Sequence, residues 1–283
     1  MINVLYSGNY KVFDGLLLSV LSMVKHTDEP LNIMCLTMDL RELNKKYVPI
    51  SPEQEKYMQK VVKDKNKESN FKLIDVTKIF KENLINSVNI KNQWTPYAML
   101  RLLCFKLDMP EKFIYLDTDT LVNRDIKLLN DIDIEGYELG VVKDAYNWSD
   151  VKRWRINKYF NSGVLLVNMK ECLKTGLFEK ATIMARDRKM LYTDQDALNL
   201  SITKKKMLPI IYNSKNKYYK EIVVHHFCDV RESRVFFISK KWWHRIKPWE
   251  VDFVKKQMSA YDDILDDYLA RKKDPKFPIV TIE

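Results

Sequence analysis

The sequence predicts an α/β protein in which helices cover both faces of a mostly parallel central sheet. Short apolar runs alternate with longer segments of helical periodicity, which is the pattern of βαβ units. Hydrophobic residues make up 46% of the 283 residues, enough for a large core. The chain contains only six glycines, and it has no internal repeat or low-complexity stretch. We therefore expect a single domain without a flexible linker.

The first half of the chain alternates strand and helix. The apolar run at the N-terminus ends in the turn Ser7-Gly8-Asn9, and the spacing of apolar residues after it is helical. A capping box at Ser51–Gln54, with Pro52 at the first helical position, begins another helix. The predicted strands are Ile2–Tyr6, Leu31–Thr37, Phe71–Thr77 and Lys112–Val122, and the predicted helices are Tyr10–Lys25, 52–66 and 96–107.

The second half is more mixed, although its apolar runs still have the lengths of strands and helices. The predicted strands are Leu139–Lys143, Gly163–Val167, Leu208–Tyr212 and Ile222–Phe227. The predicted helices are Met169–Asp187, Asp194–Thr203 and an amphipathic segment from Pro248 to Lys273.

Composition limits the partners and the location of the protein. The net charge is +10, but it is mostly lysine spread along the chain. Nucleic-acid-binding proteins instead usually rely on clustered arginine, so we expect no nucleic-acid partner. No stretch approaches the roughly 20 apolar residues that span a membrane, and the N-terminus resembles a strand rather than a signal peptide. We predict a cytoplasmic protein, with peripheral contact at the inner membrane surface as the alternative.

The four cysteines form no Cys-x-x-Cys pair and are expected to be reduced and mostly buried.

Two aspartates follow the apolar run Phe113–Leu116, at positions 117 and 119. Residues two apart on a strand point to the same side, so Asp117 and Asp119 present two carboxylates to one point in space. Two such anions repel each other unless a positive group lies between them. A divalent cation with oxygen ligands fits this position and can hold a diphosphate. The alternative is an ordinary Asp-x-Asp turn.

Three further polar clusters lie at the end of an apolar strand or the start of a helix, where open α/β sheets bind ligands. Asn161 offers a donor and an acceptor to a sugar hydroxyl, and Gly163 allows the backbone to approach a ligand closely. Residues 194–196 place carboxylates and an amide at a helix start. His225 and His226 face opposite ways on a strand, so one of them is expected to face the site. The structural alternatives are a turn, helix N-capping and a core histidine.

Taken in order, the motifs of the chain are Asn9-Tyr10, Tyr97-x-x-x-Arg101, Tyr115-Leu116-Asp117-x-Asp119, Phe160-Asn161-Ser162-Gly163-Val164, Asp194-Gln195-Asp196-x-Leu198-Asn199, His226-Phe227 and Lys247-Pro248-Trp249. This set resembles glycosyltransferase family 8, which includes bacterial lipopolysaccharide glucosyl- and galactosyltransferases and glycogenin. The resemblance covers roughly residues 2–250. It implies a Rossmann-like GT-A fold, a UDP-sugar donor, manganese, and transfer with retention at the anomeric carbon.

The resemblance also implies a division of the chain. Residues 1–250 would form the catalytic domain, with 1–125 as the nucleotide-binding half and 126–250 as the sugar and acceptor half. Residues 251–283 would form a C-terminal helix and tail.

The metal site follows from the resemblance residue by residue. Asp117, Asp119 and His226 would bind Mn²⁺, with Mg²⁺ as the alternative, because carboxylate and imidazole together suit manganese better than calcium. The metal would bridge the donor phosphates as a Lewis acid, and Lys247 would add a second positive charge there.

The donor site follows in the same way. Tyr10 would stack on uracil beside Asn9. Asp194 and Gln195 are the implied catalytic residues, lying near the anomeric carbon on the face opposite the leaving group. We favour same-face substitution, and a covalent double displacement stays open. The implied donor-site residues are Asn9, Tyr10, Arg101, Asp117, Thr118, Asp119, Asp144, Asn161, Ser162, Asp194, Gln195, His226 and Lys247.

Two features depart from the family pattern. The loop Tyr6–Asn9 lacks the carboxylate that many members place against the nucleotide. Asp229 replaces a glycine of the family pattern and begins a long insert that reaches Ile246. The insert contains aromatic and basic residues that suit a lid or an acceptor platform; the alternative is an extra hairpin packed on the core. Its prominent residues are Arg231, Arg234, Trp242, Trp243 and Arg245.

Two functions from other classes compete with the transferase hypothesis. Leu116–Thr120 also matches the Asp-x-Asp-x-Thr of haloacid-dehalogenase-type phosphatases, although that motif usually lies near the start of the chain. A catalytically dead, carbohydrate-binding member of the family is the second alternative. The sequence leaves open whether the donor carries glucose or galactose. It also leaves open whether the acceptor is a free, lipid-linked or protein-linked glycan.

Overall fold

The computed structural model describes residues 1–92, 96–144, 159–215, 219–228, 231–234 and 242–279. Its strands are β1 (Ile2–Ser7), β2 (Leu31–Thr37), β3 (Asn70–Asp75), β4 (Lys112–Leu116), β5 (Thr120–Val122), β6 (Leu139–Lys143), β7 (Phe160–Asn168), β8 (Lys205–Leu208), β9 (Val224–His226), β10 (Arg231–Arg234) and β11 (Trp242–Arg245). Its α-helices are α1 (Phe13–His26), α2 (Pro52–Lys65), α3 (Thr77–Leu84), α4 (Lys127–Asn130), α5 (Met169–Thr175), α6 (Leu177–Asp187), α7 (Thr193–Ser201), α8 (Val251–Gln257) and α9 (Asp262–Lys272). Its 3₁₀ helices are η1 (Tyr10–Val12), η2 (Pro96–Lys106), η4 (Ile210–Tyr212) and η5 (Ser259–Tyr261).

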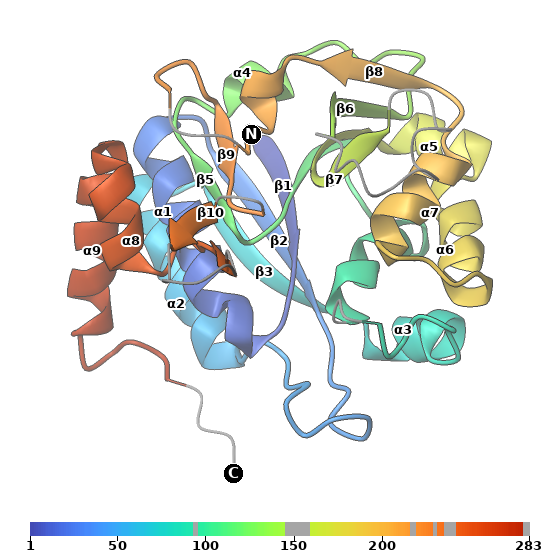
Figure 1. Cartoon of the computed structure of the whole chain (residues 1–283), viewed down its shortest axis with the longest axis horizontal. Coiled ribbons are helices and arrows are strands. Elements are labelled where there is room, and N and C mark those ends of the chain that lie inside the picture. The colour runs from blue at the N-terminus through green and yellow to red at the C-terminus, as the bar shows by residue number, and fades with distance from the viewer. Residues whose placement is uncertain (93–95, 145–158, 216–218, 229–230, 235–241, 280–283) are drawn as a thin grey trace.

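A seven-stranded sheet in the order β3-β2-β1-β4-β7-β6-β8 forms the centre of the molecule (Figure 1). Strand β1 pairs in parallel with β2 and β4, β2 with β3, and β6 with β8. Strand β7 runs antiparallel to both of its neighbours, β4 and β6. The prediction of an α/β fold with a mostly parallel central sheet is confirmed.

Alternation along each strand divides the apolar side chains between the two faces of the sheet. In β1, Ile2, Val4 and Tyr6 join the core beneath α1, α2 and α9, whereas Leu5 joins the core beneath α3, η2, α6 and α7. The helices flank the sheet on both sides (Figure 1). Within the described residues, no helix combines the length and the apolar composition needed to cross a bilayer.

Local capping explains the helix that the sequence predicted most specifically. The Ser51 hydroxyl accepts from the Gln54 N–H, and the Gln54 side chain accepts from the Ser51 N–H, so the capping box is complete. Three cysteines, Cys35, Cys104 and Cys172, are buried as free thiols, as predicted.

The predicted strand Lys112–Val122 is wrong as a single element. Strand β4 ends at Leu116, and the chain turns through Asp117–Asp119 before β5 begins at Thr120. The Thr120 hydroxyl donates to the Asp117 carbonyl at 2.8 Å and closes this turn. Strand β5 then leaves the central sheet and pairs with β9.

Other boundaries also differ from the predictions. The predicted strand Leu208–Tyr212 is wrong, because Pro209 has no N–H for the ladder and the chain enters η4 after β8. The predicted helix Met169–Asp187 divides at Gly176, whose φ of 70° ends α5. The final helix breaks at Met258 into α8 and α9. The segment 96–107 is helical as predicted but forms the 3₁₀ helix η2.

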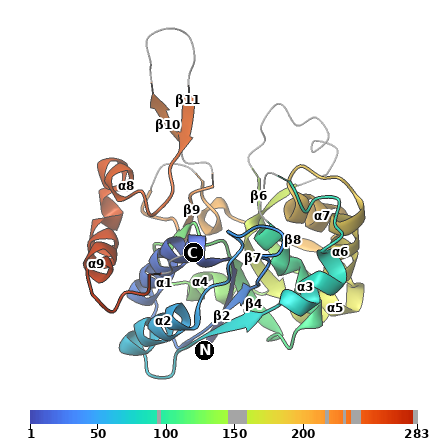
Figure 2. The same ribbon diagram turned by 90° about the horizontal axis from the view of Figure 1, so that it is seen from below.

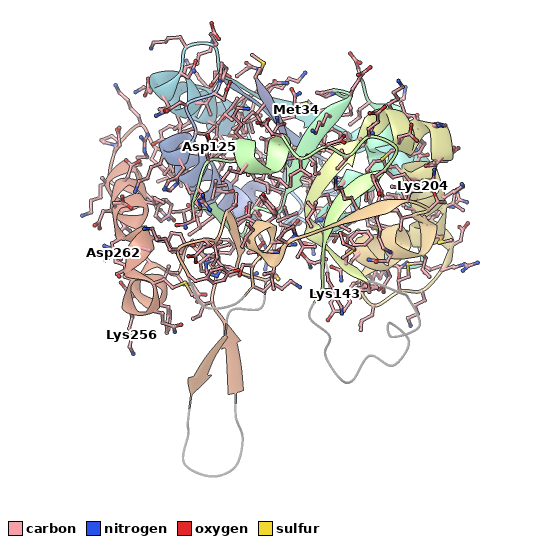
Figure 3. All side chains as sticks on the ribbon, turned by 90° about the horizontal axis from the view of Figure 1, so that it is seen from above. Met34, Asp125, Lys143, Lys204, Lys256 and Asp262 are labelled. Atoms are coloured by element: carbon pink, nitrogen blue, oxygen red, sulfur yellow. The ribbon has the colours of Figure 1, made fainter. Side chains whose placement is uncertain are left out.

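Strands β10 and β11 form an antiparallel hairpin that projects from the body of the molecule (Figure 2). The described parts of the Asp229–Ile246 insert are therefore two paired strands. Its strands extend outward instead of packing on the core, which contradicts the packed alternative. Lys143, at the end of β6, lies on the side from which the hairpin projects (Figure 3). The hairpin thus stands at the edge of the molecule where the ligand-binding ends of the strands are found.

Candidate functional site

Three candidate metal ligands converge where β4 ends. Asp117 follows β4 directly, and its N–H still bonds the Gly163 carbonyl at 2.8 Å. His226 comes from far along the chain, because β9 pairs with β5 and places His226 opposite Thr120. The Phe227 N–H donates to the Asp119 carbonyl at 2.9 Å, which holds β9 against the aspartate turn. This edge carries the carboxyl ends of the parallel strands, as expected for an open α/β sheet.

The ligand atoms of this cluster face one another. One ligand atom from each of Asp117, Asp119 and His226 lies within 4.8 Å of the others. His226 Nε2 is 3.2 Å from Asp119 Oδ1 and 3.6 Å from Asp117 Oδ2. His226 is buried, and its Nε2 makes no hydrogen bond within the described part of the chain. A buried nitrogen aimed at two carboxylate oxygens fits a divalent cation, and this mixed donor set suits manganese. His225 faces the other way and contacts the Tyr261 hydroxyl at 2.9 Å through Nδ1, as predicted.

The electrostatics of the cluster favour positive charge. Burial alone would raise the pKa of Asp119, but His226 and Lys247 outweigh burial and hold this pKa far below its usual value. Burial alone would lower the pKa of His226, but Cys228 and Asp119 outweigh it and raise this pKa to about 10. Lys247 Nζ donates to Asp119 Oδ2. Asp119 therefore stays ionised, with Lys247 and His226 held close to it.

Gly163 makes room for this arrangement. A Cβ at position 163 would lie 2.1 Å from His226 Cε1 and 2.6 Å from Asp117 Oδ2, distances that no side chain tolerates. The close approach that the structure shows at Gly163 is to the candidate metal ligands His226 and Asp117, and the predicted approach to a bound ligand stays a prediction. Gly15 acts similarly at the back of the site, since a Cβ there would lie 2.6 Å from both the Thr118 carbonyl and the Trp249 ring.

Arg101 connects the acidic groups of the site from η2. Its guanidinium donates to Asp117 Oδ1 at 2.6 Å and to the Ser162 carbonyl at 2.7 Å. Its Nε lies 3.3 Å from Asp194 Oδ2, and the group stacks over the Tyr115 ring at 4.2 Å. Arg101 thus forms ion pairs with Asp117 on the metal side and with Asp194 on the sugar side. Its contact with the sugar stays a prediction.

Asp194 and Gln195 begin α7 and are both buried against the start of β7. Ser162 Oγ donates to Asp194 Oδ2 at 2.9 Å. Burial raises the pKa of Asp194 although Arg101 opposes the shift. Gln195 Oε1 accepts from Asn161 Nδ2 at 2.8 Å and from the Ser162 N–H at 3.1 Å. The predicted sugar-side residues therefore form one connected group.

Asp144 closes this group from the end of β6. Its carboxylate accepts from Gln195 Nε2 at 2.9 Å and pairs with Lys215. Gln195 Nε2 also donates to the Tyr159 hydroxyl at 3.0 Å. The structure thus brings Asp144, Asn161, Ser162, Asp194 and Gln195 together, and their contact with a sugar stays a prediction.

The predicted nucleotide-side residues lie around the loop after β1. Asn9 is buried, and its Oδ1 accepts from the Lys11 N–H at 3.2 Å, which caps η1. Tyr10 is half-buried beside it, and its N–H donates to the Val48 carbonyl. Thr118 is buried between the two aspartates. Their contacts with a nucleotide stay predictions, as does the contact of Lys247 with a diphosphate.

Sequence reasoning missed several residues of the site. Asn213 Oδ1 lies 3.0 Å from His226 Nδ1, and Asn213 Nδ2 donates to Asn161 Oδ1 at 2.9 Å. Tyr115 donates to Asp117 Oδ1 at 3.0 Å and contacts Ser7 Oγ at 2.8 Å. The only sequence signal for Asn213 was its place near the end of an apolar run, which many surface asparagines share. The side chains of the insert, with Trp242 and Trp243, lie outside the described part of the structure.

Comparisons with known proteins point to one family. The family model described as Glycosyl transferase family 8 matches residues 2–251. The chain is 30% identical over 132 residues to the lipopolysaccharide 1,2-glucosyltransferase of Escherichia coli K12, covering 43% of this chain and 39% of that protein. It is 33% identical over 96 residues to general stress protein A of Bacillus subtilis 168, covering 31% of this chain and 34% of that protein. A Haemophilus influenzae protein matches at 30% identity over 207 residues, 70% of this chain and 58% of its own length. The chain thus spans less than two thirds of the length of these relatives.

Solved structures share the fold over almost the whole chain. A galactosyltransferase named LgtC, in complex with donor and acceptor sugar analogs, has a TM-score of 0.68 at 18% identity over 94% of this chain and 96% of that one. The glycosyltransferase GlyE of Streptococcus pneumoniae TIGR4 has a TM-score of 0.62 at 17% identity over 96% of this chain and 65% of that one. At these identities the likeness shows the fold alone.

Proposed function

This chain belongs to glycosyl transferase family 8, and from that membership we propose that it moves a hexose from a UDP-sugar to a glycan or glycoconjugate acceptor. We propose glucose or galactose as the hexose, Mn²⁺ as the cofactor, and retention at the anomeric carbon. The observation that carries the proposal is the convergence of Asp117, Asp119 and His226, with His226 Nε2 buried and aimed at both carboxylates. A metal bound there would supply Lewis-acid stabilisation of charge on the departing UDP.

The residues of the chain itself divide the remaining work. Lys247, already beside Asp119, provides a second cation for the diphosphate. Arg101 pairs with both Asp117 and Asp194, which fixes the positions of the two carboxylates relative to each other. Asn9 and Tyr10 border the nucleotide, and Asn161 with Asp144 borders the sugar. We propose the same division for the chain as a whole, with 1–125 on the nucleotide side, 126–250 on the sugar and acceptor side, and 251–283 as a C-terminal addition.

The hydrogen bonds of Gln195 support same-face substitution over attack by this amide. An amide oxygen has two lone pairs, and Gln195 Oε1 already accepts from Asn161 Nδ2 and the Ser162 N–H. Its Nε2 donates to Asp144 and Tyr159. Gln195 is therefore placed to shape the sugar pocket, with its oxygen turned into the protein.

The competing functions have less support. Family membership argues against the phosphatase hypothesis, in which Asp117 would act as the nucleophile. In addition, Asp117 Oδ1 accepts from both Arg101 and Tyr115. A carbohydrate-binding member without activity would have no need of three converging metal ligands, but only turnover can decide that alternative.

The deciding experiment is a panel of nucleotide sugars with and without Mn²⁺, followed by thermal shift and by release of UDP. We expect UDP-glucose or UDP-galactose to raise the melting temperature only with metal and to be hydrolysed slowly. Excess chelator should reverse both effects. If no UDP-sugar yields UDP and manganese leaves donor binding unchanged, the proposed function is wrong. Donor binding without UDP release would instead favour the inactive, sugar-binding alternative.

A further inference from the structure

A chain of buried side-chain amides joins the sugar side of the site to the metal side. Gln195 Nε2 donates to Asp144, and Gln195 Oε1 accepts from Asn161 Nδ2. Asn161 Oδ1 accepts from Asn213 Nδ2, and Asn213 Oδ1 faces His226 Nδ1 at 3.0 Å. All three amides and the histidine are buried, so water does not substitute for these partners.

Backbone N–H groups fix the direction of the hydrogen bonds in this series of amides, because an N–H can only donate. The Ser162 N–H can only donate, so the atom of Gln195 that it meets must be the oxygen. The Gly163 N–H donates to Asn161 at 3.0 Å, which fixes Oδ1 of that amide in the same way. Asn161 Oδ1 can only accept, so Asn213 must present its NH₂ group to it. The carbonyl oxygen of Asn213 is therefore turned toward the histidine.

The consequence falls on the imidazole of His226. Since Asn213 Oδ1 can only accept, Nδ1 must carry the hydrogen, and the lone pair of a neutral imidazole must lie on Nε2. Nε2 is the atom that faces Asp117 and Asp119. Two backbone amides of β7 thus set the tautomer of a histidine on β9, through side chains that are far apart in the sequence.

The backbone around Asn213 makes this contact rigid. The Ser214 N–H donates to the Val224 carbonyl, and the His226 N–H donates to the Ser214 carbonyl at 2.8 Å. Residues 213 and 214 therefore lie along β9, and the Asn213 side chain is held beside His226 by its hydrogen bonds to Asn161 and to the imidazole.

We propose that Asn213 is a positioning residue for the metal, acting through His226 by fixing Nδ1 as the protonated nitrogen and Nε2 as the metal ligand. This inference rests on the proposed function, because it assumes that the cluster binds a divalent cation. Partners that orient a metal-binding histidine typically change metal affinity by about 10- to 100-fold when they are removed.

Mn²⁺ binding without any sugar donor, measured by the loss of the free-ion EPR signal, tests the proposal directly. Asn213→Ala removes the acceptor, and we expect Mn²⁺ to bind about 10- to 100-fold more weakly. Asn213→Asp keeps an acceptor toward Nδ1 but places a second acceptor against Asn161. We expect this variant to melt at a lower temperature and yet to bind Mn²⁺ more tightly than Asn213→Ala. If Asn213→Ala does not fold, Asn213→Leu keeps the volume without the acceptor and carries the same expectation.

Asn89→Ala is the matched control. Asn89 is also a buried amide, and its Nδ2 donates to the carbonyls of Ala185 and Arg188. Losing this amide should lower the melting temperature without changing Mn²⁺ affinity. Equal Mn²⁺ affinity in the wild type and Asn213→Ala, or an equal loss in the alanine and aspartate variants, would overturn the role of Asn213. Failure of the wild-type protein itself to bind Mn²⁺ would instead contradict the proposed function.

Discussion

Each charged group in the site is matched by a specific neighbour. Arg101 pairs with Asp117, and Lys247 pairs with Asp119, so these partly buried carboxylates are compensated before any ligand arrives. Removing one partner from such a pair leaves an uncompensated charge, and this is more costly than losing a fully exposed pair. A substitution in the site can therefore change both folding stability and metal binding, and the two must be measured separately.

Asp119→Ala should abolish Mn²⁺-dependent binding of the donor. The variant loses a ligand of the candidate metal itself, so we expect a larger loss of Mn²⁺ affinity than the roughly 10- to 100-fold typical of outer partners. Titration of Mn²⁺ and thermal shift with UDP-sugar measure the two effects. Asp187→Ala is the control, since Asp187 pairs with Arg186 at the exposed end of α6. Unaltered Mn²⁺ binding in Asp119→Ala would sink the metal assignment.

Asp194 should make the stability of the protein depend on pH. Burial raises the pKa of its carboxyl in the folded state, so the folded protein holds this proton more tightly than the unfolded chain does. Stability is therefore lost as pH rises from the unfolded to the folded pKa. Relative to wild type, Asp194→Asn should become progressively more stabilising as pH rises from about 4, the ordinary pKa of an aspartate, toward the raised pKa of Asp194 in the folded protein. Melting temperatures of both proteins across this range are the measurement, and a gap that shrinks with rising pH would contradict it.

At the scale of elements, the site depends on a departure from regular structure. The chain leaves the central sheet after β4, turns through the aspartates and pairs again as β5 with β9. A straight strand would continue the sheet past Leu116 and would leave no place for β9. The turn is what brings His226 to the aspartates.

Gly163→Ala should damage this junction between elements. The added Cβ would overlap His226 Cε1, and His226 cannot move far because β5 holds its strand. We expect destabilisation of about 1–3 kcal/mol, typical of overpacking, together with weaker Mn²⁺ binding. Gly140→Ala is the matched control on the neighbouring strand β6, where a Cβ would meet Leu208 Cδ1 at 3.2 Å and Leu166 Cβ at 3.3 Å, both apolar side chains outside the metal cluster. Denaturant unfolding and Mn²⁺ titration compare the two, and unchanged Mn²⁺ affinity in Gly163→Ala would show that the close approach is unimportant.

At the scale of the whole molecule, the sheet gathers distant residues at one edge. This edge holds the ends of β1, β4 and β6 together with the start of β7. Strand β7 runs opposite to its neighbours β4 and β6, so it begins where they end. The β10–β11 hairpin projects on the same side (Figures 2 and 3). Because it projects beyond the ends of the strands, the hairpin stays a candidate for the predicted lid or acceptor platform.

Replacing residues 231–245 with an Asn-Gly turn should separate the two halves of the reaction. The strands of the hairpin pair with each other, so we expect the body to fold and UDP-sugar hydrolysis to continue. Transfer to an acceptor should fall, because the projecting surface would be gone. Release of UDP and formation of glycosylated product, measured in the same variant, provide the comparison. Full transfer activity would assign the hairpin no part in acceptor binding.

Local patterns account for most of the predicted elements. The capping box before α2, the apolar run of β2 and the alternation in β1 depend on neighbours in sequence, and these elements were predicted closely. The split between β4 and β5 was missed, since it depends on which partner strand offers hydrogen bonds. The end of β8 was missed although Pro209 marks it in the sequence. In the same way, His226 was predicted by its motif, whereas Asn213 was not.

The sequence by itself determined the fold class and the identities of the chemical groups, because both are written in local periodicity and in residue type. It did not determine which groups touch. Only the tertiary structure decided that Arg101 braces two aspartates, that Gly163 makes room for His226, and that Asn213 turns its oxygen toward Nδ1. These contacts join segments on different strands and helices. Which atom donates and which accepts is settled only when the folded sheet has brought those segments together.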